Sequence, residues 1–173
     1  MVGMKIKIDI AKNCKSWNAH KSINKLLLAD ITKNVLSRFE NFQAVKQFEI
    51  SILLTDNHEM LKLNDTYRNN KKVTNVLSFP DINIDSSCVL EFKPNRDYMY
   101  LGDIAFSYQI IMDESKQQDK IFEHHFIHLF VHSVLHLIGF NHEDDKEAHY
   151  MEQLEVNILE SLSIPSPYIT NNH

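Results

Sequence analysis

The sequence predicts a single domain in which helices and strands interleave, of the α+β or mixed α/β class. The chain has 173 residues, about the length of one domain, and 43% of them are hydrophobic, enough to bury a core. Segments with the two-residue periodicity of strands alternate with segments of helical periodicity. No internal repeat or linker divides the chain, so we expect one domain over residues 1–173.

The N-terminal part begins with a strand, a helix and a second strand. Residues 4–10 alternate charged and apolar side chains, which is typical of a half-buried strand. Residues 20–39 place apolar side chains at helical spacing, with Leu26 on the expected apolar face. Residues 48–54 are rich in apolar and β-branched side chains and favour a central strand.

A short helix and two further strands follow. Asp56 with Glu59 three residues later resembles a capping box, which predicts a helix start. Residues 76–79 are an extended segment stopped by Pro80, and residues 98–107 form another extended stretch.

The C-terminal half contains the most apolar segment of the chain. Residues 81–97 are polar and predict a long loop. Residues 118–138 are apolar on nearly every side, so we expect a buried helix there. A last amphipathic helix is predicted over residues 144–162, and the tail after about residue 163 should fray.

Composition and charge exclude several classes of function. Three glycines are too few for a Walker loop or a dinucleotide-binding turn. The net charge is −5, but residues 1–50 carry nine Lys or Arg and four Asp or Glu, so either a local basic face or ordinary solvated helix surfaces fit. Cys14 and Cys88 fit no metal or redox motif, and no signal peptide or membrane span is evident, which predicts a cytoplasmic protein.

The segment HSVLHLIGFNH carries the clearest chemical signal. His132 and His136 are four residues apart, so on a helix both imidazoles leave the same face. Gly139 is placed to end the helix in a left-handed turn, which would bring His142 back toward the pair. Three histidines with an open fourth position describe a catalytic zinc site, and we expect one zinc ion per chain.

A structural interpretation competes with this one, since an isolated pair of histidines four apart is more often two ordinary helix residues. The third histidine, the glycine and the apolar helix make a metal site the better interpretation. His128 lies one turn earlier, and we expect it behind the ligands rather than among them. Zinc peptidases with this spacing have a glutamate after the first histidine, whereas this chain has Ser133, which disfavours peptide hydrolysis.

HSVLHLIGFNH resembles the HGxLHLxGYDH signature of the YbeY family of bacterial endoribonucleases. Two further regions agree in order and spacing: NDTYR at residues 64–68 with TNVLSFP at 74–80, and LGDI at 101–104. The matches extend over most of the chain, from about residue 48 to 160. The resemblance implies an α+β fold with a small mixed sheet of about four strands flanked by helices, including a metzincin-like zinc-binding helix.

The resemblance also implies a function and a set of site residues. The family cleaves single-stranded RNA, acts in rRNA processing at the 16S rRNA 3′ end and in ribosome quality control, and so has the small ribosomal subunit as partner, with no membrane or DNA partner expected. It implies zinc on His132, His136 and His142, and a catalytic role for Arg68. Three positions depart from the family pattern, at Ser133, Asn141 and Asn75, and the last two remove a possible carboxylate near the metal.

The substrate-binding residues are predicted from their chemistry. Arg68 offers a permanently charged planar fork to a phosphate, and zinc is expected to activate either water or the scissile phosphate. Lys71 and Lys72 would extend a basic edge along the RNA, or simply form a solvated turn. Ser78 lies on an expected edge strand beside the cleft. Gly102 suggests a β-bulge or a close backbone approach.

Two other functions fit the same ligand pattern. A zinc hydrolase of another kind, such as a peptidase, would turn over peptides. A ribosome-binding module with a structural zinc would keep its interaction after its metal is removed. We prefer the endoribonuclease, because three ordered motifs agree with that family.

Overall fold

The structure, a computed structural model, describes residues 3–168 and has an α+β fold built on one mixed sheet. Its strands are β1 (Lys5–Lys12), β2 (Gln47–Thr55), β3 (Val76–Pro80) and β4 (Tyr98–Ser107), and they lie in the order β1-β2-β4-β3. The first three in this order are parallel, and β3 runs antiparallel to β4. The predicted four-stranded mixed sheet is therefore confirmed.

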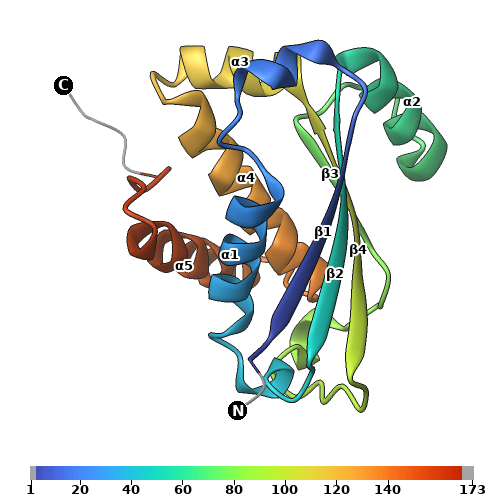
Figure 1. Ribbon diagram of the computed structural model, residues 1–173, viewed down its shortest axis with the longest axis vertical. Helices are drawn as coiled ribbons and strands as arrows, with labels where there is room; N and C mark the ends of the chain where they lie inside the picture. The colour runs from blue at the N-terminus through green and yellow to red at the C-terminus, as the bar shows by residue number, and fades with distance from the viewer. Residues whose placement is uncertain (1–2, 169–173) are drawn as a thin grey trace.

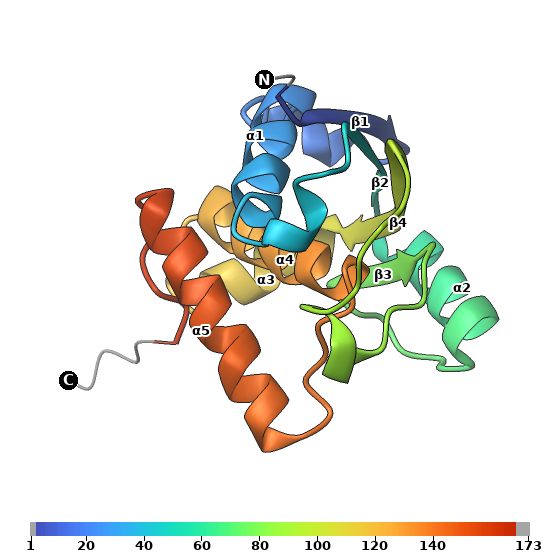
Figure 2. The same cartoon turned by 90° about the horizontal axis from the view of Figure 1, so that it is seen from below.

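Of the five α-helices in residues 3–168, four lie on one side of the sheet (Figure 1). The helices are α1 (Lys25–Leu36), α2 (Asn57–Arg68), α3 (Tyr108–Gln117), α4 (Phe122–Leu137) and α5 (Asp145–Ser161). Only α2 lies on the opposite face, where it packs over one end of the sheet. Seen from below, α4 lies between the sheet and α5 (Figure 2). The main core therefore lies between the sheet and α1 and α4.

Most predicted elements are present, with shifted boundaries. The helix expected over residues 20–39 is shorter, because the side chain of Asn24 accepts the Leu27 N–H and fixes the start at Lys25. Leu26 is 74% exposed, so its expected place on the apolar face is wrong. The predicted helix over residues 118–138 starts only at Phe122, after a turn in which Asp119 has a positive φ of 51°.

One helix has no counterpart in the sequence analysis. Residues 108–117 form α3, whose buried side chains are only Ile111 and Ser115. Tyr108 and Met112, partly buried, pack against the core beside Ile111, so the helical spacing of these three residues was the available signal.

The apolar helix α4 is held rigidly at the centre of the protein. Eleven of its 16 residues are buried, which confirms the predicted buried helix. Phe126 and Phe130 are fully buried and pack against Phe106 of β4, with ring centroids 4.6 Å and 6.4 Å from it. Side chains on the remaining face of α4 are therefore presented from a fixed scaffold.

Gly102 creates a β-bulge in β4, as the sequence suggested. The pairing between β2 and β4 shifts register there, and Gly102 has a φ of +137°. A Cβ at this position would lie 2.2 Å from the backbone oxygen of Phe79 on β3. Only glycine allows β3 to approach β4 this closely, and β3 forms one wall of the cleft described below.

Replacing Gly102 by alanine should destabilise the protein by about 3 kcal/mol, because the added carbon meets a backbone atom and the φ is unfavourable for an L residue. The measurement is the midpoint of urea unfolding. Gly3→Ala is the matched control, since nothing lies within 4 Å of a Cβ built there. Equal midpoints for the two variants would contradict this account of the bulge.

The C-terminal segment departs from the predicted frayed tail as far as Tyr168. Ile164 is buried, and the Tyr168 hydroxyl donates a hydrogen bond to Glu155 of α5. These contacts hold the segment against the protein, and residues 169–173 lie outside the described part. Within the described residues, no helix combines the length and the apolar character needed to cross a membrane.

Candidate metal centre

Three histidines converge at the C-terminal end of α4. His132 and His136 lie one turn apart on the helix, and His142 lies in the segment that follows it. Gly139 has a φ of +108° and its N–H donates to the carbonyl of His136 at 3.0 Å, so the helix ends in a left-handed turn. This turn reverses the chain toward His142, which confirms that Gly139 ends the helix as predicted.

The three imidazoles lie close enough to share one ion. One nitrogen from each of His132, His136 and His142 lies within 4.8 Å of the other two. The ring centroids of His136 and His142 are 5.0 Å apart, and those of His132 and His142 are 5.5 Å apart. The structure thus brings the three predicted ligands together.

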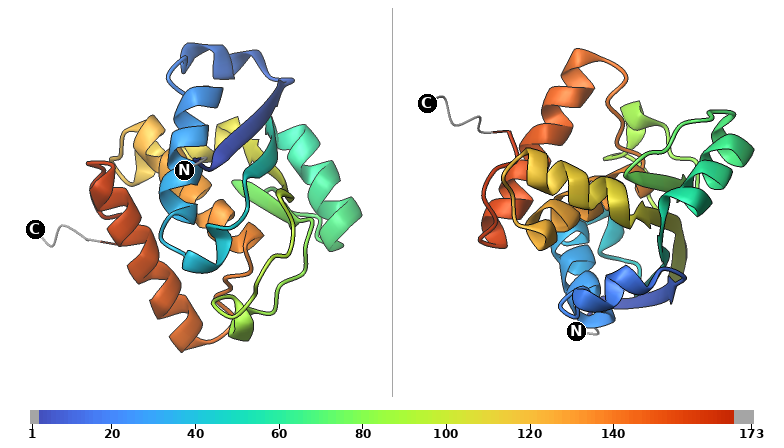
Figure 3. Two further views of the ribbon diagram at one scale, coloured as in Figure 1. Left: turned by 60° about the horizontal axis from the view of Figure 1, so that its bottom comes forward. Right: turned by 90° about the horizontal axis from the view of Figure 1, so that it is seen from above.

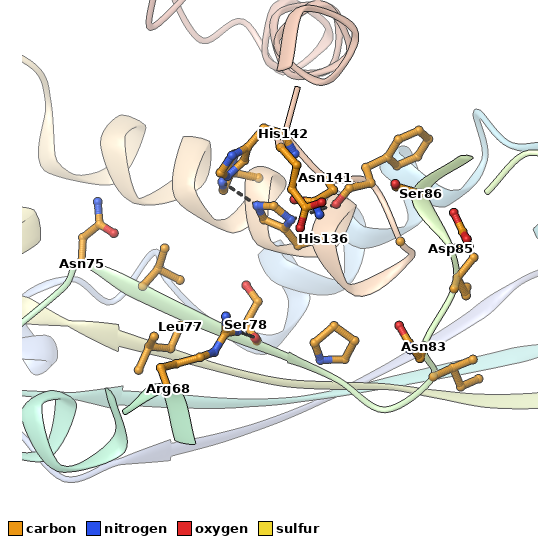
Figure 4. Close-up of a pocket in the computed structure, with 18 residues that line it drawn as sticks. Arg68, Asn75, Leu77, Ser78, Asn83, Asp85, Ser86, His136, Asn141 and His142 are labelled. Atoms are coloured by element: carbon orange, nitrogen blue, oxygen red, sulfur yellow. Dashed lines mark hydrogen bonds between the residues drawn. The ribbon is translucent and has the colours of Figure 1, made fainter. Parts of the chain in front are cut away.

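The hydrogen bonds of the two helix histidines fit a bound cation. His132 Nδ1 donates to Glu155, and His136 Nδ1 donates to the backbone oxygen of Phe140 at 2.9 Å. With Nδ1 as the donor, the Nε2 of each ring is left to offer a lone pair, and these two nitrogens are 2.9 Å apart (dashed line, Figure 4). Two lone pairs at this distance repel each other unless they share a positive charge. The donor set therefore suits a divalent metal.

Glu155 is a buried carboxylate behind the histidines that sequence reasoning missed. It is 0% exposed and accepts hydrogen bonds from His132 and from the hydroxyl of Tyr168, and His128 Nε2 lies 3.4 Å from it. Burial alone would raise the pKa of Glu155, but the hydrogen bonds from His128 and His132 lower this pKa to about 2. A permanent anion thus holds His132 in the tautomer that leaves Nε2 free for metal.

Glu155→Gln should lower zinc affinity by about 10- to 100-fold, because an amide orients His132 less strongly and removes the negative charge behind it. The affinity is measured by competition with a chromophoric chelator. Glu160→Gln on the same helix is the control, since Glu160 is exposed. If both variants bind zinc as tightly as the original chain, Glu155 does not support the ligand.

Burial also prepares His136 for metal binding. Burial, together with the repulsion of a second positive charge by the nearby His132 and His142, lowers the pKa of His136 to about 4. His136 is therefore neutral at pH 7, with its lone pair available to a metal. Metal binding at this ring does not have to displace a proton.

The same pKa predicts how the metal-free protein responds to acid. An unfolded histidine takes up its proton near pH 6.5, whereas folded His136 does so only near pH 4, so the folded state loses stability as the pH falls between these values. The full loss is on the order of 3 kcal/mol. Urea unfolding of chelator-treated protein should show about 2 kcal/mol of this loss between pH 7 and pH 5. His136→Gln should lose less stability over this interval, and an equal loss would contradict the assignment.

The metal centre opens into a cleft of about 640 Å³ between α4 and β3. Figure 4 shows His136 and His142 above Leu77 and Ser78 of β3. Arg68 and Asn75 lie toward one end of the cleft, and Asn83, Asp85 and Ser86 lie toward the other. The edge strand predicted beside the cleft is thus confirmed.

The loop over residues 81–97 forms the far end of the cleft. It lies beside the segment that joins α4 to α5 (Figure 3), and the Ser86 hydroxyl donates to Glu147 at 2.7 Å. Its residues Asn83, Asp85 and Ser86 line the cleft, and sequence reasoning missed them because a polar loop gives no sign of what it faces.

Among the predicted substrate-binding residues, Arg68 and Ser78 line the cleft and the lysines do not. Arg68 donates to the backbone oxygen of Ser78 at 2.6 Å and lies over the ring of Phe79. Lys71 and Lys72 are exposed beyond Arg68, and Lys72 borders a neighbouring hollow that Arg68 also lines.

The three departures from the family pattern have different surroundings. Ser133 is 0% exposed and its hydroxyl bonds to the backbone of Leu129, so it faces the core and not the cleft. Asn75 donates to Glu114 at 3.1 Å, a contact that an aspartate would turn into repulsion. Asn141 lies beside His142 and accepts the His142 N–H at 2.8 Å.

The other histidines of α4 do not join the three ligands. His128 contacts Glu155 and so lies behind His132, as expected. His125 pairs with Glu114 at 2.7 Å, and the same carboxylate accepts the amide of the cleft residue Asn75. His124 borders a separate hollow near the C-terminal segment.

Comparison with known proteins agrees with the geometry. The family model for Endoribonuclease YbeY matches residues 13–163. The chain is 38% identical over 165 residues to the Endoribonuclease YbeY of Bartonella quintana (strain Toulouse), covering 94% of this chain and 97% of that protein.

A solved structure shows the same fold. The solution structure of TM1509 from Thermotoga maritima superimposes with a TM-score of 0.53 and 20% sequence identity, over 96% of this chain and 99% of that one. With the match of the family model and the identity to a curated relative, the chain belongs to the YbeY family of endoribonucleases, which are RNA-cleaving enzymes.

Proposed function

We propose that the protein is a zinc-dependent endoribonuclease that cleaves single-stranded RNA during rRNA processing. The observation that carries the proposal is the convergence of His132, His136 and His142 on one wall of a cleft whose opposite side presents Arg68. Nitrogen ligands from three histidines favour zinc, and would leave a fourth position for water or substrate. Zinc bound there supplies a Lewis acid and lowers the pKa of a water molecule.

Side chains of the protein bind the RNA and orient the metal ligands. Arg68 binds the scissile phosphate, since its guanidinium keeps free N–H groups besides the one that bonds to Ser78. The Ser78 backbone holds this guanidinium at the cleft, and its hydroxyl contacts the RNA. Lys71 and Lys72 attract the RNA backbone beyond the cleft. Glu155 fixes the orientation of His132.

The biological setting follows from the family. We propose residues 1–173 as one endoribonuclease domain that acts in the cytoplasm on the 16S rRNA 3′ end, with the small ribosomal subunit as partner and a role in ribosome quality control. Single-stranded RNA suits the open cleft, because its bases and backbone are accessible together.

Removal and return of the metal test the proposal. Protein stripped with a chelator should lose cleavage of a single-stranded rRNA fragment and regain it with one equivalent of zinc. A contaminating metal-independent nuclease would still cleave the RNA after treatment with the chelator. Equal RNA cleavage with and without metal would contradict the metal-dependent mechanism. Turnover of peptides instead of RNA would favour a peptidase, and RNA or ribosome binding without any cleavage would favour a binding module with structural zinc.

A further inference from the structure

A second, smaller cavity opens beside the metal cleft. Its volume is about 190 Å³, and three of its residues, Ser86, Phe140 and Asn141, also line the cleft. Asn141 directly precedes the ligand His142, and Figure 4 shows Ser86 and Asn141 on the side of the cleft away from Arg68. A group bound in this cavity therefore lies next to whatever occupies the metal centre.

One wall of the cavity is aromatic and exposed. Tyr150 of α5 is 45% exposed, and its ring centroid lies 5.8 Å from that of the buried Phe140. Leu90, on the loop between β3 and β4, is 58% exposed and lines the same cavity. An accessible tyrosine ring supported by a second ring is the surface on which proteins stack unpaired bases.

The polar groups of the cavity complement the edge of a base. One carboxylate oxygen of Glu147 accepts the Ser86 hydroxyl at 2.7 Å, which leaves the other oxygen as an acceptor. Asn141 uses its side-chain oxygen for the His142 N–H, and its NH₂ group has no partner among the described residues. An acceptor and a donor in the lining of one cavity suit a heterocycle that carries both kinds of group.

The charges argue against a phosphate in the same place. Glu147 and Glu91 both line the cavity, and neither a lysine nor an arginine does. A phosphate would be repelled by two carboxylates, whereas an uncharged base would not. The RNA backbone then remains at the cleft, where Arg68 lies.

We propose that this cavity is a nucleobase subsite. It receives the base of a nucleotide next to the scissile phosphate, with the face of the base on Tyr150 and its edge toward Glu147 and Asn141. The inference rests on the proposed ribonuclease function and adds to it the part of the chain that binds a base.

The test uses a labelled single-stranded RNA whose cleavage site has been mapped with the original chain. Tyr150→Ala should raise KM, or weaken RNA binding, by about 5- to 150-fold, whereas Tyr150→Phe keeps the ring and should stay within about twofold. Tyr98→Ala is the matched control, since Tyr98 is 44% exposed and lines neither the cleft nor the cavity. Thermal melting shows that each variant is folded.

A second arm identifies the nucleotide. One abasic residue is placed in turn at each position beside the cleavage site. At one position, the abasic residue should raise the KM of the unsubstituted protein by the same factor as Tyr150→Ala does. In the Tyr150→Ala variant, the abasic residue at this position should raise the KM no further. Equal KM values for Tyr150→Ala and Tyr98→Ala would overturn the subsite. So would an abasic residue that raises the KM by the same factor in the Tyr150→Ala variant as in the unsubstituted protein.

The two proposals fail in different ways. If the original chain cleaves no RNA with zinc bound, the proposed function is wrong, and the subsite is judged by the affinity of the same oligonucleotide in fluorescence anisotropy. Equal affinity of Tyr150→Ala and Tyr150→Phe would then overturn the subsite as well. If the original chain cleaves RNA and Tyr150→Ala cleaves it equally well, only the subsite is wrong.

Discussion

His136→Ala should purify without zinc and should lose RNA cleavage by at least about 10³-fold. His136 would supply one of the three proposed nitrogen ligands, and the two remaining histidines would hold a divalent ion too weakly to survive purification. Loss of the metal removes several kcal/mol of stabilisation from the transition state. Zinc content is measured by elemental analysis, and cleavage is measured on a single-stranded rRNA fragment.

The control for this variant is another histidine of the same chain. His58 is exposed at the start of α2 and lies outside the three-histidine group, so His58→Ala should keep both zinc and activity. Both variants are purified in parallel with the original chain, so that a contaminating ribonuclease would appear in all three. Cleavage by His136→Ala at the original rate would rule out the metal centre as the active site.

Arg68→Ala should lower RNA cleavage by about 10²- to 10³-fold while leaving zinc content unchanged. Arg68 is the arginine that lines the cleft, and its loss removes the charged fork proposed to bind the phosphate. Arg68→Lys should restore only part of the activity, since an ammonium group is a point charge and cannot bond in the same forked way. Steady-state kinetics and zinc analysis of the same samples separate the two effects.

Arg38→Ala is the matched control for Arg68. Arg38 is exposed on the surface, bonds to Asn34 and Ser161, and lies outside the cleft. Because Arg68 also holds the Ser78 backbone, the melting temperature of each variant is compared first. A folded Arg68→Ala protein that cleaves RNA as fast as Arg38→Ala would end the proposed role of Arg68.

Local sequence patterns were sufficient for most of the sheet and for the ligand set. The period of two in β1 and the β-branched residues in β2 identify strands because each side chain has a fixed direction relative to the sheet. The spacing of His132 and His136 fixes a shared helix face, and Gly139 identifies the turn, because these properties depend only on neighbouring residues. Leu26 is exposed although its spacing predicts the apolar face, because the face of a helix that is buried depends on packing against distant segments.

Only the tertiary structure revealed the partners of the site. Glu155 lies 23 residues from His132 along the chain, and the two meet only because α5 packs on α4. A glutamate between Met151 and Ile158 on the buried side of α5 was the available signal, but its partner could not be named. The loop of residues 81–97 and Tyr150 likewise acquire a role only through the cavities they border.

The sequence by itself determined the fold class, the three candidate histidine ligands and the family resemblance, because periodicity, spacing and motif order are properties of the chain alone. The tertiary structure decided that Arg68 lines the cleft while Lys71 and Lys72 do not, that Ser133 faces the core, and that a buried carboxylate orients His132. The physical reason is that hydrogen bonds and burial depend on contacts between segments far apart in sequence, which no local pattern specifies.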